Sequence, residues 1–448
     1  MSIFYIPIDL KIEDYQDWDI NDEVISNFES IEDYKYNIKE LRNNSRYLES
    51  LPVETILNFF DSLAIYWLND KDSKFLTSFS NLGVSFLVNF IKRTNLEALL
   101  RESLHGDIHF LDDFYKVSSF NKKMMAHPRG VITHWLAGNV PILGMISLIQ
   151  GMITKNANVI KLPRENGVVL PLMASQIANF DFISGNMTIK GKDLLKSCLF
   201  VYCDRNDKNG QELLSLNTDI RVAWGGREAV ETVMSLPRKF GTDDVIFGPK
   251  YSFVAIGRNS FNKDKLKDIT YRLAVDVSVF EQQGCNSPHT VFVEKGGQVS
   301  PLDFSKALAI SMDEVLKRIP KDPVSADEAI TIVNIRSEYS FSGRVFSSKG
   351  TEWTVIYSEE TGLAEACYSR TIFVRPVESL SEIFDCIEQN KHQSLGLSIK
   401  VSEKNRFAKE ATRKGIERIT EIGKMSYFEY PWDGMFPSER FVRWVSTN

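Results

Sequence analysis

One cysteine of this 448-residue chain stands in a sequence suited to nucleophilic chemistry. Cys285 follows Gly284 and precedes Asn286, Ser287 and Pro288, residue types that form turns and can expose a thiol at the end of a sheet. An ionised thiol attacks carbonyl carbons, so we predict that Cys285 is a catalytic nucleophile. The alternative is a cysteine that only occupies a turn.

The other cysteines stand in sequences typical of buried structure. Cys198 and Cys203 flank an apolar strand pattern and Cys386 lies in a helical pattern, where a cysteine usually behaves as a small apolar residue. Five cysteines, an odd number, do not resemble a disulfide framework. The N-terminal sequence carries acidic residues where a secretory signal carries Lys or Arg. We therefore expect a cytoplasmic protein.

A carbonyl group under attack needs hydrogen-bond donors where its oxygen becomes negative. Asn139, in the loop Gly138-Asn139-Val140-Pro141, could aim its amide NH2 group at such an oxyanion, with the backbone N–H of Cys285 as a second donor. The same loop also suits an asparagine that only shapes a turn. Both interpretations of Asn139 stay open from the residues alone.

A pair of glycines indicates an anion-binding turn. Trp224-Gly225-Gly226 ends a strand pattern and precedes a helix pattern from about Glu228. Glycine allows a pyrophosphate to approach a helix N-terminus, where unpaired N–H groups favour anions. The motif is not Gly-x-Gly-x-x-Gly, and glycine is common in strand-to-helix turns. Lys161, which follows the strand pattern NVI, is either a cofactor contact or a solvated lysine.

The histidines do not suggest a metal site, because no His pair or Cys/His cluster has ligand spacing. His289 lies close to Cys285 in sequence, but it begins an extended run whose register should turn it elsewhere. We therefore do not assign His289 as the catalytic base. His127 and His134 are expected to be packing residues.

The elements that must position these residues follow an α/β pattern. Residues 1–115 are mostly helical in pattern, with apolar residues spaced by three and four along the segment 56–68. Beyond them, β-rich apolar runs alternate with amphipathic segments, which predicts right-handed crossovers and a largely parallel sheet buried on both faces. The spacing over 261–280 predicts a helix that runs directly into the segment carrying Cys285.

A stretch of 25 residues, Gly130 to Thr154, has no Lys, Arg, Asp or Glu and is long enough to cross a bilayer. Its central Gly-Asn-x-Pro turn would leave backbone polar groups unpaired in lipid. We interpret the stretch as a buried strand, VITHWL, a tight loop, and a buried helix from Pro141 to about Ile153. No transmembrane segment is expected.

The chain has 53 Lys and Arg residues against 59 Asp and Glu residues, a net charge of −6. It therefore has no basic surplus to neutralise a phosphate backbone, which argues against nucleic acid as the main partner. Hydrophobic residues make up 43% and charged residues 25%, as in ordinary globular proteins, which excludes disordered and fibrous classes.

Taken in order, these motifs resemble the aldehyde dehydrogenase superfamily. HPRGVITHWLAGNVPILGM is similar to its P-x-G-V segment and oxyanion-asparagine loop, NVIKLPREN to its V-V-x-K-P-x-E, WGGREAV to its G-S-x-x-V-G loop and EQQGCNSP to its G-Q-x-C segment. The Trp-Gly-Gly form, the run QQGCNSP, the strand SRTIFV and the ending WDGMFPSERFVRWV resemble more specifically the LuxC-type fatty-acyl reductases of bacterial luminescence. The resemblance covers about residues 115–448.

The resemblance implies a Rossmann-type cofactor domain, an α/β catalytic domain and a reaction in two steps. Cys285 would take the acyl group of an acyl-CoA or an acyl-protein, with Asn139 as an oxyanion donor. Hydride from NADPH would then release an aldehyde and the free thiol.

The cofactor residues implied by the resemblance are Lys161, Arg164, Trp224, Gly225 and Gly226. Lys161 and Arg164 could both reach an adenosine 2′-phosphate, and Arg suits bidentate phosphate contacts. We therefore predict NADPH over NADH.

Two segments depart from the superfamily pattern. The superfamily's E-L-G-G-K motif, which carries the general base for hydrolysis, is replaced by residues 245–250, VIFGPK. Without that carboxylate the acyl-enzyme should survive until hydride attacks it, which favours thioester reduction over oxidation to acid. The superfamily's E-x-F-G-P cofactor motif is replaced by residues 367–370, CYSR.

The expected organisation is a helical N-terminal region over 1–115, a cofactor domain over 116–250, a catalytic domain over 251–430 and a tail over 431–448. We expect homo-oligomers, and the resemblance implies an acyl-activating ligase as a possible partner. Two alternatives stay open: a CoA-acylating aldehyde dehydrogenase that uses NAD in the opposite direction, and a non-redox acyl carrier that holds an acyl group on Cys285.

Overall fold

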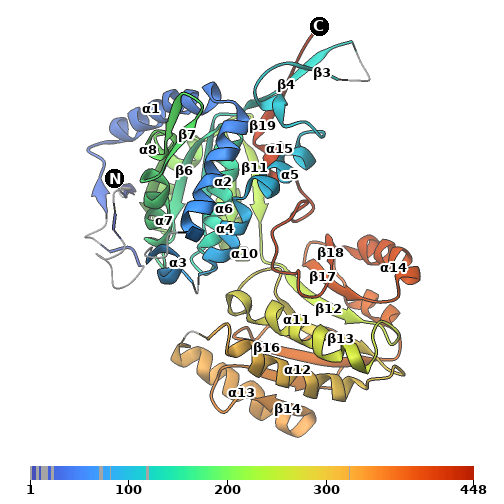
Figure 1. Cartoon of the computed structure of the whole chain (residues 1–448). Helices are drawn as coiled ribbons and strands as arrows, with labels where there is room; N and C mark the ends of the chain where they lie inside the picture. Colours follow the sequence, from blue (N-terminus) through green and yellow to red (C-terminus); the bar gives the residue numbers. More distant parts are fainter. Residues whose placement is uncertain are drawn as a thin grey trace. The chain divides into compact units, whose positions relative to one another are not determined.

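The computed structural model describes residues 3–6, 10–11, 19–21, 25–69, 74–80, 82–117, 121–321 and 323–448. The chain forms two compact units (Figure 1). The first unit comprises Met1–Gly248 together with Met435–Asn448, and the second comprises Pro249–Gly434. The segments expected as an N-terminal region and a cofactor domain therefore share one unit, and the end of the chain returns to it.

The strands of the first unit are β1 Ile3–Tyr5, β2 Ser26–Asn27, β3 Tyr115–Lys116, β4 Lys123–Pro128, β5 Val131–Trp135, β6 Ala157–Leu162, β7 Asp181–Ser184, β8 Met187–Lys190, β9 Cys198–Cys203, β10 Ile220–Trp224, β11 Asp243–Phe247 and β19 Val442–Thr447. Its helices are α1 Ile31–Ser50, α2 Val53–Asn69, α3 Lys74–Ser78, α4 Val84–Phe90, α5 Arg93–Ser103, η2 Ile108–Leu111, α6 Ile142–Ile153, α7 Val169–Ala178, α8 Gly191–Leu195, α9 Lys208–Leu216, α10 Arg227–Ser235 and α15 Pro437–Arg440.

The main sheet of the first unit has the order β11-β10-β5-β6-β9-β1-β2. The strands from β11 to β9 are parallel, and β1 and β2 extend the sheet with antiparallel pairing. The chain runs from β5 outward to β6 and β9 and then returns to the other side of β5 with β10 and β11. The strand order therefore reverses between β5 and β10, as in dinucleotide-binding sheets. The pairing of β1 with β9 was not expected in a region predicted to be mostly helical.

Helices cover both faces of this sheet. Side chains alternate along a strand, and on β5 Val131 and Trp135 belong to a core that includes residues of α1, α9 and α10. His134 points to the opposite face, where it hydrogen-bonds to Ser147 on α6. The strand, loop and helix expected over Gly130–Thr154 are thus confirmed as β5, a loop and α6.

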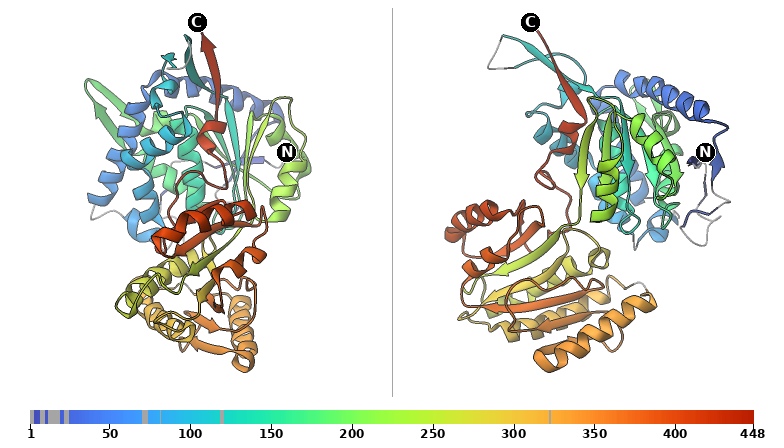
Figure 2. Two further views of the ribbon diagram at one scale, coloured as in Figure 1. Left: turned by 90° about the vertical axis from the view of Figure 1, so that its right-hand side faces the viewer. Right: turned by 180° about the vertical axis from the view of Figure 1, so that it is seen from behind.

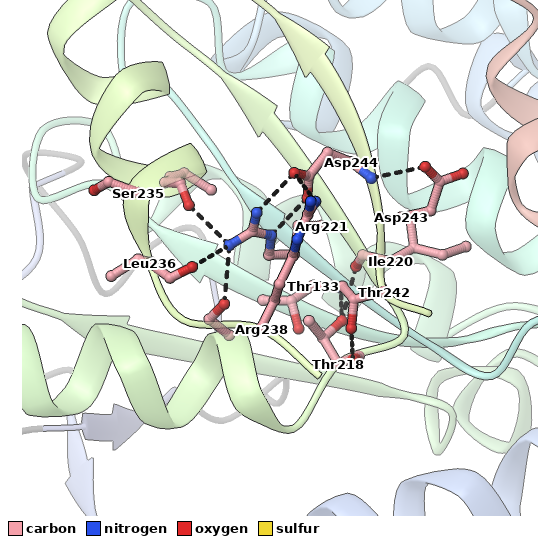
Figure 3. Close-up of polar contacts among 12 residues, drawn as sticks. Thr133, Thr218, Ile220, Arg221, Ser235, Leu236, Arg238, Thr242, Asp243 and Asp244 are labelled. Atoms are coloured by element: carbon pink, nitrogen blue, oxygen red, sulfur yellow. Dashed lines mark hydrogen bonds and ion pairs between the residues drawn. The ribbon is translucent and has the colours of Figure 1, made fainter. Parts of the chain in front are cut away.

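A buried arginine ties α10 to the sheet. Arg221, on β10, is fully buried and pairs with both carboxylate oxygens of Asp244 on β11, at 2.6 and 2.7 Å (Figure 3). It also donates to the carbonyl oxygens of Val233 and Leu236, at 2.9 and 3.0 Å. These contacts hold the C-terminal end of α10, so its N-terminus is fixed at the glycine pair.

Smaller sheets complete the first unit. Strands β3, β4 and β19 form an antiparallel sheet, so the last residues of the chain pair with β4, and β7 and β8 form a hairpin. Within the described ranges, no helix is both long and apolar enough to cross a bilayer.

The strands of the second unit are β12 Tyr251–Ile256, β13 Pro288–Glu294, β14 Arg344–Ser347, β15 Thr354–Tyr357, β16 Thr371–Val377, β17 His392–Ser398 and β18 Arg418–Thr420. Its helices are η3 Lys263–Lys265, α11 Leu266–Ser278, η4 Val279–Gln282, α12 Pro301–Leu316, α13 Ala326–Ser342, η5 Leu380–Cys386 and α14 Val401–Lys414.

The sheet of the second unit has the order β14-β15-β16-β13-β12-β17-β18, parallel except for β14. Helices pack on both faces of this sheet (Figure 2). Val254 and Ile256 of β12 pack with α11 and α12 on one face. Phe253 and Ala255 pack with η5 and α14 on the other. The central strands are therefore buried on both faces, which explains their nearly continuous apolar sequences.

Candidate active site

Cys285 lies in the loop between η4 and β13, at the amino-terminal edge of the second sheet. The helix predicted to run to residue 280 ends at Ser278, because Phe280, Glu281 and Gln282 all have positive φ values, between 52° and 63°. Non-glycine residues rarely take this left-handed conformation. The loop position predicted for Cys285 is confirmed, and the turn before it is sharper than the sequence indicated.

Hydrogen bonds from neighbouring strands hold the Cys285 loop. The carbonyl oxygen of Cys285 accepts a hydrogen bond from Ser252 Oγ at 2.7 Å, and Ser252 Oγ accepts one from the backbone N–H of Ser394 at 3.1 Å. The side chain of Asn286 donates to the carbonyl oxygen of Met425 at 2.7 Å. Residues on β12 and β17 therefore fix the backbone on which the thiol stands.

A second set of residues with positive φ values contacts the first set and stabilises it. Tyr368, Ser369 and Arg370 have φ values between 50° and 58°. The backbone N–H of Ser369 donates to the carbonyl oxygen of Glu281 at 3.1 Å, and the buried guanidinium of Arg370 pairs with the Glu281 carboxylate. The residues 367–370 that replace the superfamily's cofactor motif thus include a structural clamp on the nucleophile loop.

The environment of Cys285 disfavours its ionised form. Burial and the negative charge of Asp433 raise its pKa to about 12, while hydrogen bonds from Gln393 and from the backbone N–H groups of Cys285 and Asn286 act in the opposite direction. The net effect keeps Cys285 as a thiol at neutral pH.

The pKa does not distinguish Cys285 from the other cysteines. Burial raises the pKa of Cys198 and Cys203 to about 12, and it also raises the pKa of Cys367 and Cys386. Hydrogen-bond donors do not distinguish it either, because Gln211 Nε2 donates to Cys203 Sγ at 3.5 Å. What sets Cys285 apart is the left-handed turn that precedes it.

The histidines belong to the packed interior. The ring of His289 lies 5.2 Å from the ring of Tyr251 and 5.2 Å from that of Tyr368, and burial lowers its pKa to about 4. His134 is buried and hydrogen-bonds to Ser147 and Asn158, so its prediction as a packing residue is confirmed.

Two residues near Cys285 were missed by sequence analysis. Gln393, on β17, is buried and donates to the carboxylate of Asp433, and both act on the Cys285 thiol. The signal was the polar run His392-Gln393-Ser394 inside a buried strand, because buried polar groups need partners. Asp433 stands in the ending WDGMFPSERF, where nothing indicated its partner.

In the first unit, Asn139 is exposed in the loop between β5 and α6. Asn166 donates to the carbonyl oxygen of Gly138 at 3.0 Å, and a Cβ atom at Gly138 would lie 2.6 Å from the carbonyl oxygen of Glu165. The loop is therefore held close to the segment after β6, and glycine is required for that approach.

The glycine pair forms an open helix N-terminus. Gly226 is the N-cap of α10 and no side chain caps the helix. A Cβ atom at Gly226 would meet nothing within 4 Å. These features fit a cofactor pyrophosphate. The Trp224 side chain contacts other parts of the first unit: its ring stacks on Phe247 with 3.8 Å between ring centroids, and its N–H donates to Ser147 Oγ at 3.3 Å.

Lys161 lies near the carboxyl end of β6, and Arg164 lies in the segment that follows this strand. Lys161 is half-buried, and burial lowers its pKa, opposed by the charges of Cys203 and Asp204. Arg164 is exposed. Both residues, like the glycine pair, follow or end parallel strands at the carboxyl edge of the sheet.

The structure thus gathers the predicted cofactor residues and Asn139 at one edge of the first unit. The Asn139 loop follows β5 and the glycine pair follows β10, the two strands between which the strand order reverses. Ligands of open α/β sheets bind at such a reversal. Cys285 belongs to the second unit, and its pairing with Asn139 stays a prediction.

Comparison with known proteins agrees with this geometry. A family model described as acyl-CoA reductase (LuxC) matches residues 48–444. The match begins within α1, so it takes in much of the helical region that we expected to lie outside the resemblance. The long-chain acyl-protein thioester reductase of Vibrio harveyi is 26% identical over 460 residues, covering 95% of this chain and 92% of the relative. That of Aliivibrio fischeri is 28% identical over 353 residues, covering 76% and 68%.

Solved aldehyde dehydrogenases share the fold. Aldehyde dehydrogenase 21 from Physcomitrella patens, in complex with succinate, has a TM-score of 0.65 at 10% identity and covers 100% of this chain and 97% of its own. The NADP-dependent glyceraldehyde-3-phosphate dehydrogenase from Bacillus halodurans, complexed with NADP, has a TM-score of 0.62 at 13% identity and covers 93% and 91%. The aldehyde-dehydrogenase-like α/β fold is therefore confirmed. With the family match, it follows that the chain belongs to the acyl-CoA reductase (LuxC) family, oxidoreductases that act on acyl or aldehyde groups.

Proposed function

We propose that this protein reduces a fatty-acyl thioester to the aldehyde through an S-acyl intermediate on Cys285. The observation that carries the proposal is the Cys285 loop, which hydrogen bonds from Ser252 and Asn286 hold at the amino edge of the second sheet. Family membership supports the reaction class.

The first step is acyl transfer to the enzyme. Cys285 Sγ bonds to the thioester carbonyl carbon, the carbonyl oxygen becomes negative, and the bond to the donor sulfur then breaks. The proton of the Cys285 thiol ends on the released donor thiol. The backbone N–H groups of Cys285 and Asn286, which favour the ionised form of the thiol, are the donors that we propose for this oxyanion. Asn139 is the further donor that we propose.

The second step reduces the acyl-enzyme. A reduced nicotinamide, when bound, supplies the hydride for this step. Gly225 and Gly226 would leave room for its pyrophosphate, and Lys161 and Arg164 would supply positive charge at the same edge. We propose NADPH because an adenosine 2′-phosphate would suit these two cations.

The site disfavours hydrolysis of the acyl-enzyme. Residues 245–250 carry no carboxylate, and Val245 and Phe247 are buried core residues of β11. No carboxylate from this segment can therefore activate water against the thioester, and the product should be aldehyde and not acid.

The two relatives are long-chain acyl-protein thioester reductases, which favours a protein-bound, long-chain donor, whereas the family is described as acyl-CoA reductases. We propose an acyl thioester of either kind. Supply by an acyl-activating ligase and assembly into homo-oligomers are further predictions. The CoA-acylating dehydrogenase would run the same chemistry backward with NAD, and a non-redox carrier would bind no nicotinamide.

The test combines turnover with acyl mapping. Purified protein is incubated with acyl-CoAs and acyl-proteins of varied chain length plus NADPH, and nicotinamide absorbance and aldehyde are measured. We expect aldehyde from the wild type and loss of turnover in Cys285→Ala. Without NADPH, mass spectrometry should find one acyl group on the peptide containing Cys285. Full turnover of Cys285→Ala, or a carboxylic acid product, would overturn the proposal.

A further inference from the structure

Gln393 uses only the nitrogen end of its amide. Its Nε2 donates to Asp433, and the amide lowers the pKa of the nearby Cys285 thiol, while its Oε1 is buried and has no hydrogen-bond partner among the described residues. A carboxamide NH2 group has two hydrogens, so one nitrogen can serve both acceptors. Among the residues that the structure describes, only the hydrogen bond to Asp433 fixes the orientation of this amide.

A structural glutamine in the same unit behaves differently. Gln282 uses both ends of its amide: Oε1 accepts from the backbone N–H of Thr371 at 2.7 Å, and Nε2 donates to the carbonyl oxygens of Pro288 and Thr371 at 2.8 and 3.0 Å. Gln282 therefore has a structural role, because its hydrogen bonds connect its own loop to neighbouring strands. Gln393 makes no comparable backbone contacts in the described residues, and its contacts are to two groups that carry or develop negative charge.

The backbone places Gln393 beside the nucleophile independently of that contact. Ser252 Oγ on β12 accepts a hydrogen bond from the backbone N–H of Ser394, the residue after Gln393. It also donates a hydrogen bond to the carbonyl oxygen of Cys285. Strand β12 lies between β17 and β13 in the sheet (Figure 1). Gln393 is on β17, and the Cys285 loop leads into β13. The position of Gln393 is thus set by the sheet.

We propose that Gln393 is a catalytic residue that stabilises the Cys285 thiolate with one N–H of its amide, and that Asp433 is the positioning residue that holds the amide in this orientation. An ionised carboxylate only accepts hydrogen bonds, so Asp433 selects the nitrogen end of the amide. The second N–H then remains for the sulfur. The catalytic meaning of this inference rests on the proposed function.

Asp433 has two opposing effects on the thiol. Its charge repels a thiolate, whereas its hydrogen bond orients the donor that stabilises one. Asp433 itself faces Lys250, which favours its charge, and Glu417, which opposes it, and burial raises its pKa to about 6. Lys250 and Glu417 pair with each other at 3.1 Å. Asp433 is therefore mainly ionised at pH 8, where the test is made.

The test measures alkylation of Cys285 by iodoacetamide at pH 8, followed by mass spectrometry on the peptide between Arg272 and Lys295, which contains no other cysteine. Because the thiolate is the reactive form, the rate reports its population. Gln393→Leu should lower the rate by about tenfold or more, the size expected for a charge-assisted hydrogen bond. The exposed Gln389→Leu is the matched control and should not change it. An unchanged rate in Gln393→Leu would overturn the proposal.

A double-mutant cycle tests the role of Asp433. In the Gln393→Leu background, Asp433→Asn removes only a repelling charge and should raise the alkylation rate. With Gln393 present, Asp433→Asn also releases the amide, and the rate should fall. The same factor in both backgrounds would show that Asp433 does not position Gln393.

Folding and acyl transfer are checked separately. Circular dichroism and thermal melting confirm that each variant folds, and Gln393→Met, of similar length without a donor, repeats the test if Gln393→Leu does not. Alkylation needs neither acyl donor nor cofactor, so it can fail while acyl transfer to Cys285 stands. Slower acylation with unchanged alkylation would assign Gln393 to the substrate and overturn its action on the sulfur.

Discussion

The two units use opposite edges of their sheets. In the first unit, the predicted cofactor residues and Asn139 lie at the carboxyl edge, in loops that lead to helix N-termini. In the second unit, Cys285, Ser252 and Gln393 lie at the amino edge, where strands begin. The first edge offers backbone N–H groups to an anion, whereas the second holds a thiol with side chains from adjacent strands. An anion-binding edge must leave backbone N–H groups accessible, whereas an edge that positions a nucleophile must hold it with contacts from neighbouring strands.

The largest expected effect concerns ionisation of the braced thiol. Because the pKa of Cys285 is raised to about 12, the thiolate fraction should increase about tenfold per pH unit, so alkylation should rise about a thousandfold between pH 6 and pH 9. Iodoacetamide labelling followed by peptide mass spectrometry measures this slope. A plateau below pH 8 would show that groups outside the second unit stabilise the thiolate.

The next effect concerns the clamp on the nucleophile loop. Arg370→Leu leaves Glu281 without its buried partner and should destabilise the second unit by about 3 kcal/mol. Arg221→Leu should do the same in the first unit through Asp244. Amide hydrogen exchange distinguishes the two substitutions, because each should lower the protection of backbone amides in the unit that carries it. Equal loss of protection in both units would show that the effect of each substitution is not local.

Asn139→Ala should slow acylation of Cys285 by about a hundredfold if its amide stabilises the oxyanion. The same substitution should leave alkylation of Cys285 unchanged, because no oxyanion forms in that reaction. Single-turnover acylation and labelling are compared on one preparation. Unchanged acylation would leave Asn139 as a turn residue.

The smallest effect concerns the open edge. Gly226→Val places a side chain where the chain itself has nothing within 4 Å, so folding should be unaffected. Its branched side chain should weaken NADPH binding about tenfold if the pyrophosphate binds at this glycine pair as we propose. Fluorescence titration measures the Kd, with the exposed Thr232→Val on the same helix as control. Unchanged affinity would place the pyrophosphate elsewhere.

Local signals predicted much of this arrangement. The turn residues around Cys285, the Gly-Asn-x-Pro loop and the glycine pair act over a few residues, and all three lie where the sequence placed them. Gln393 and Asp433 are far from Cys285 along the chain, and only the strand order brings them to it. The left-handed residues before Cys285 and Thr371 were also missed, because none is glycine and tertiary contacts impose their conformation.

The path of the chain has a consequence for synthesis on the ribosome. The second unit is inserted between Gly248 and Met435, and β19 pairs with β4 only after the whole insertion has been made. Domains form as the nascent chain emerges, N-terminal parts first. The unit that starts to fold first is therefore completed last, and an intermediate with an unpaired edge at β4 must persist until residues 442–447 have been synthesised.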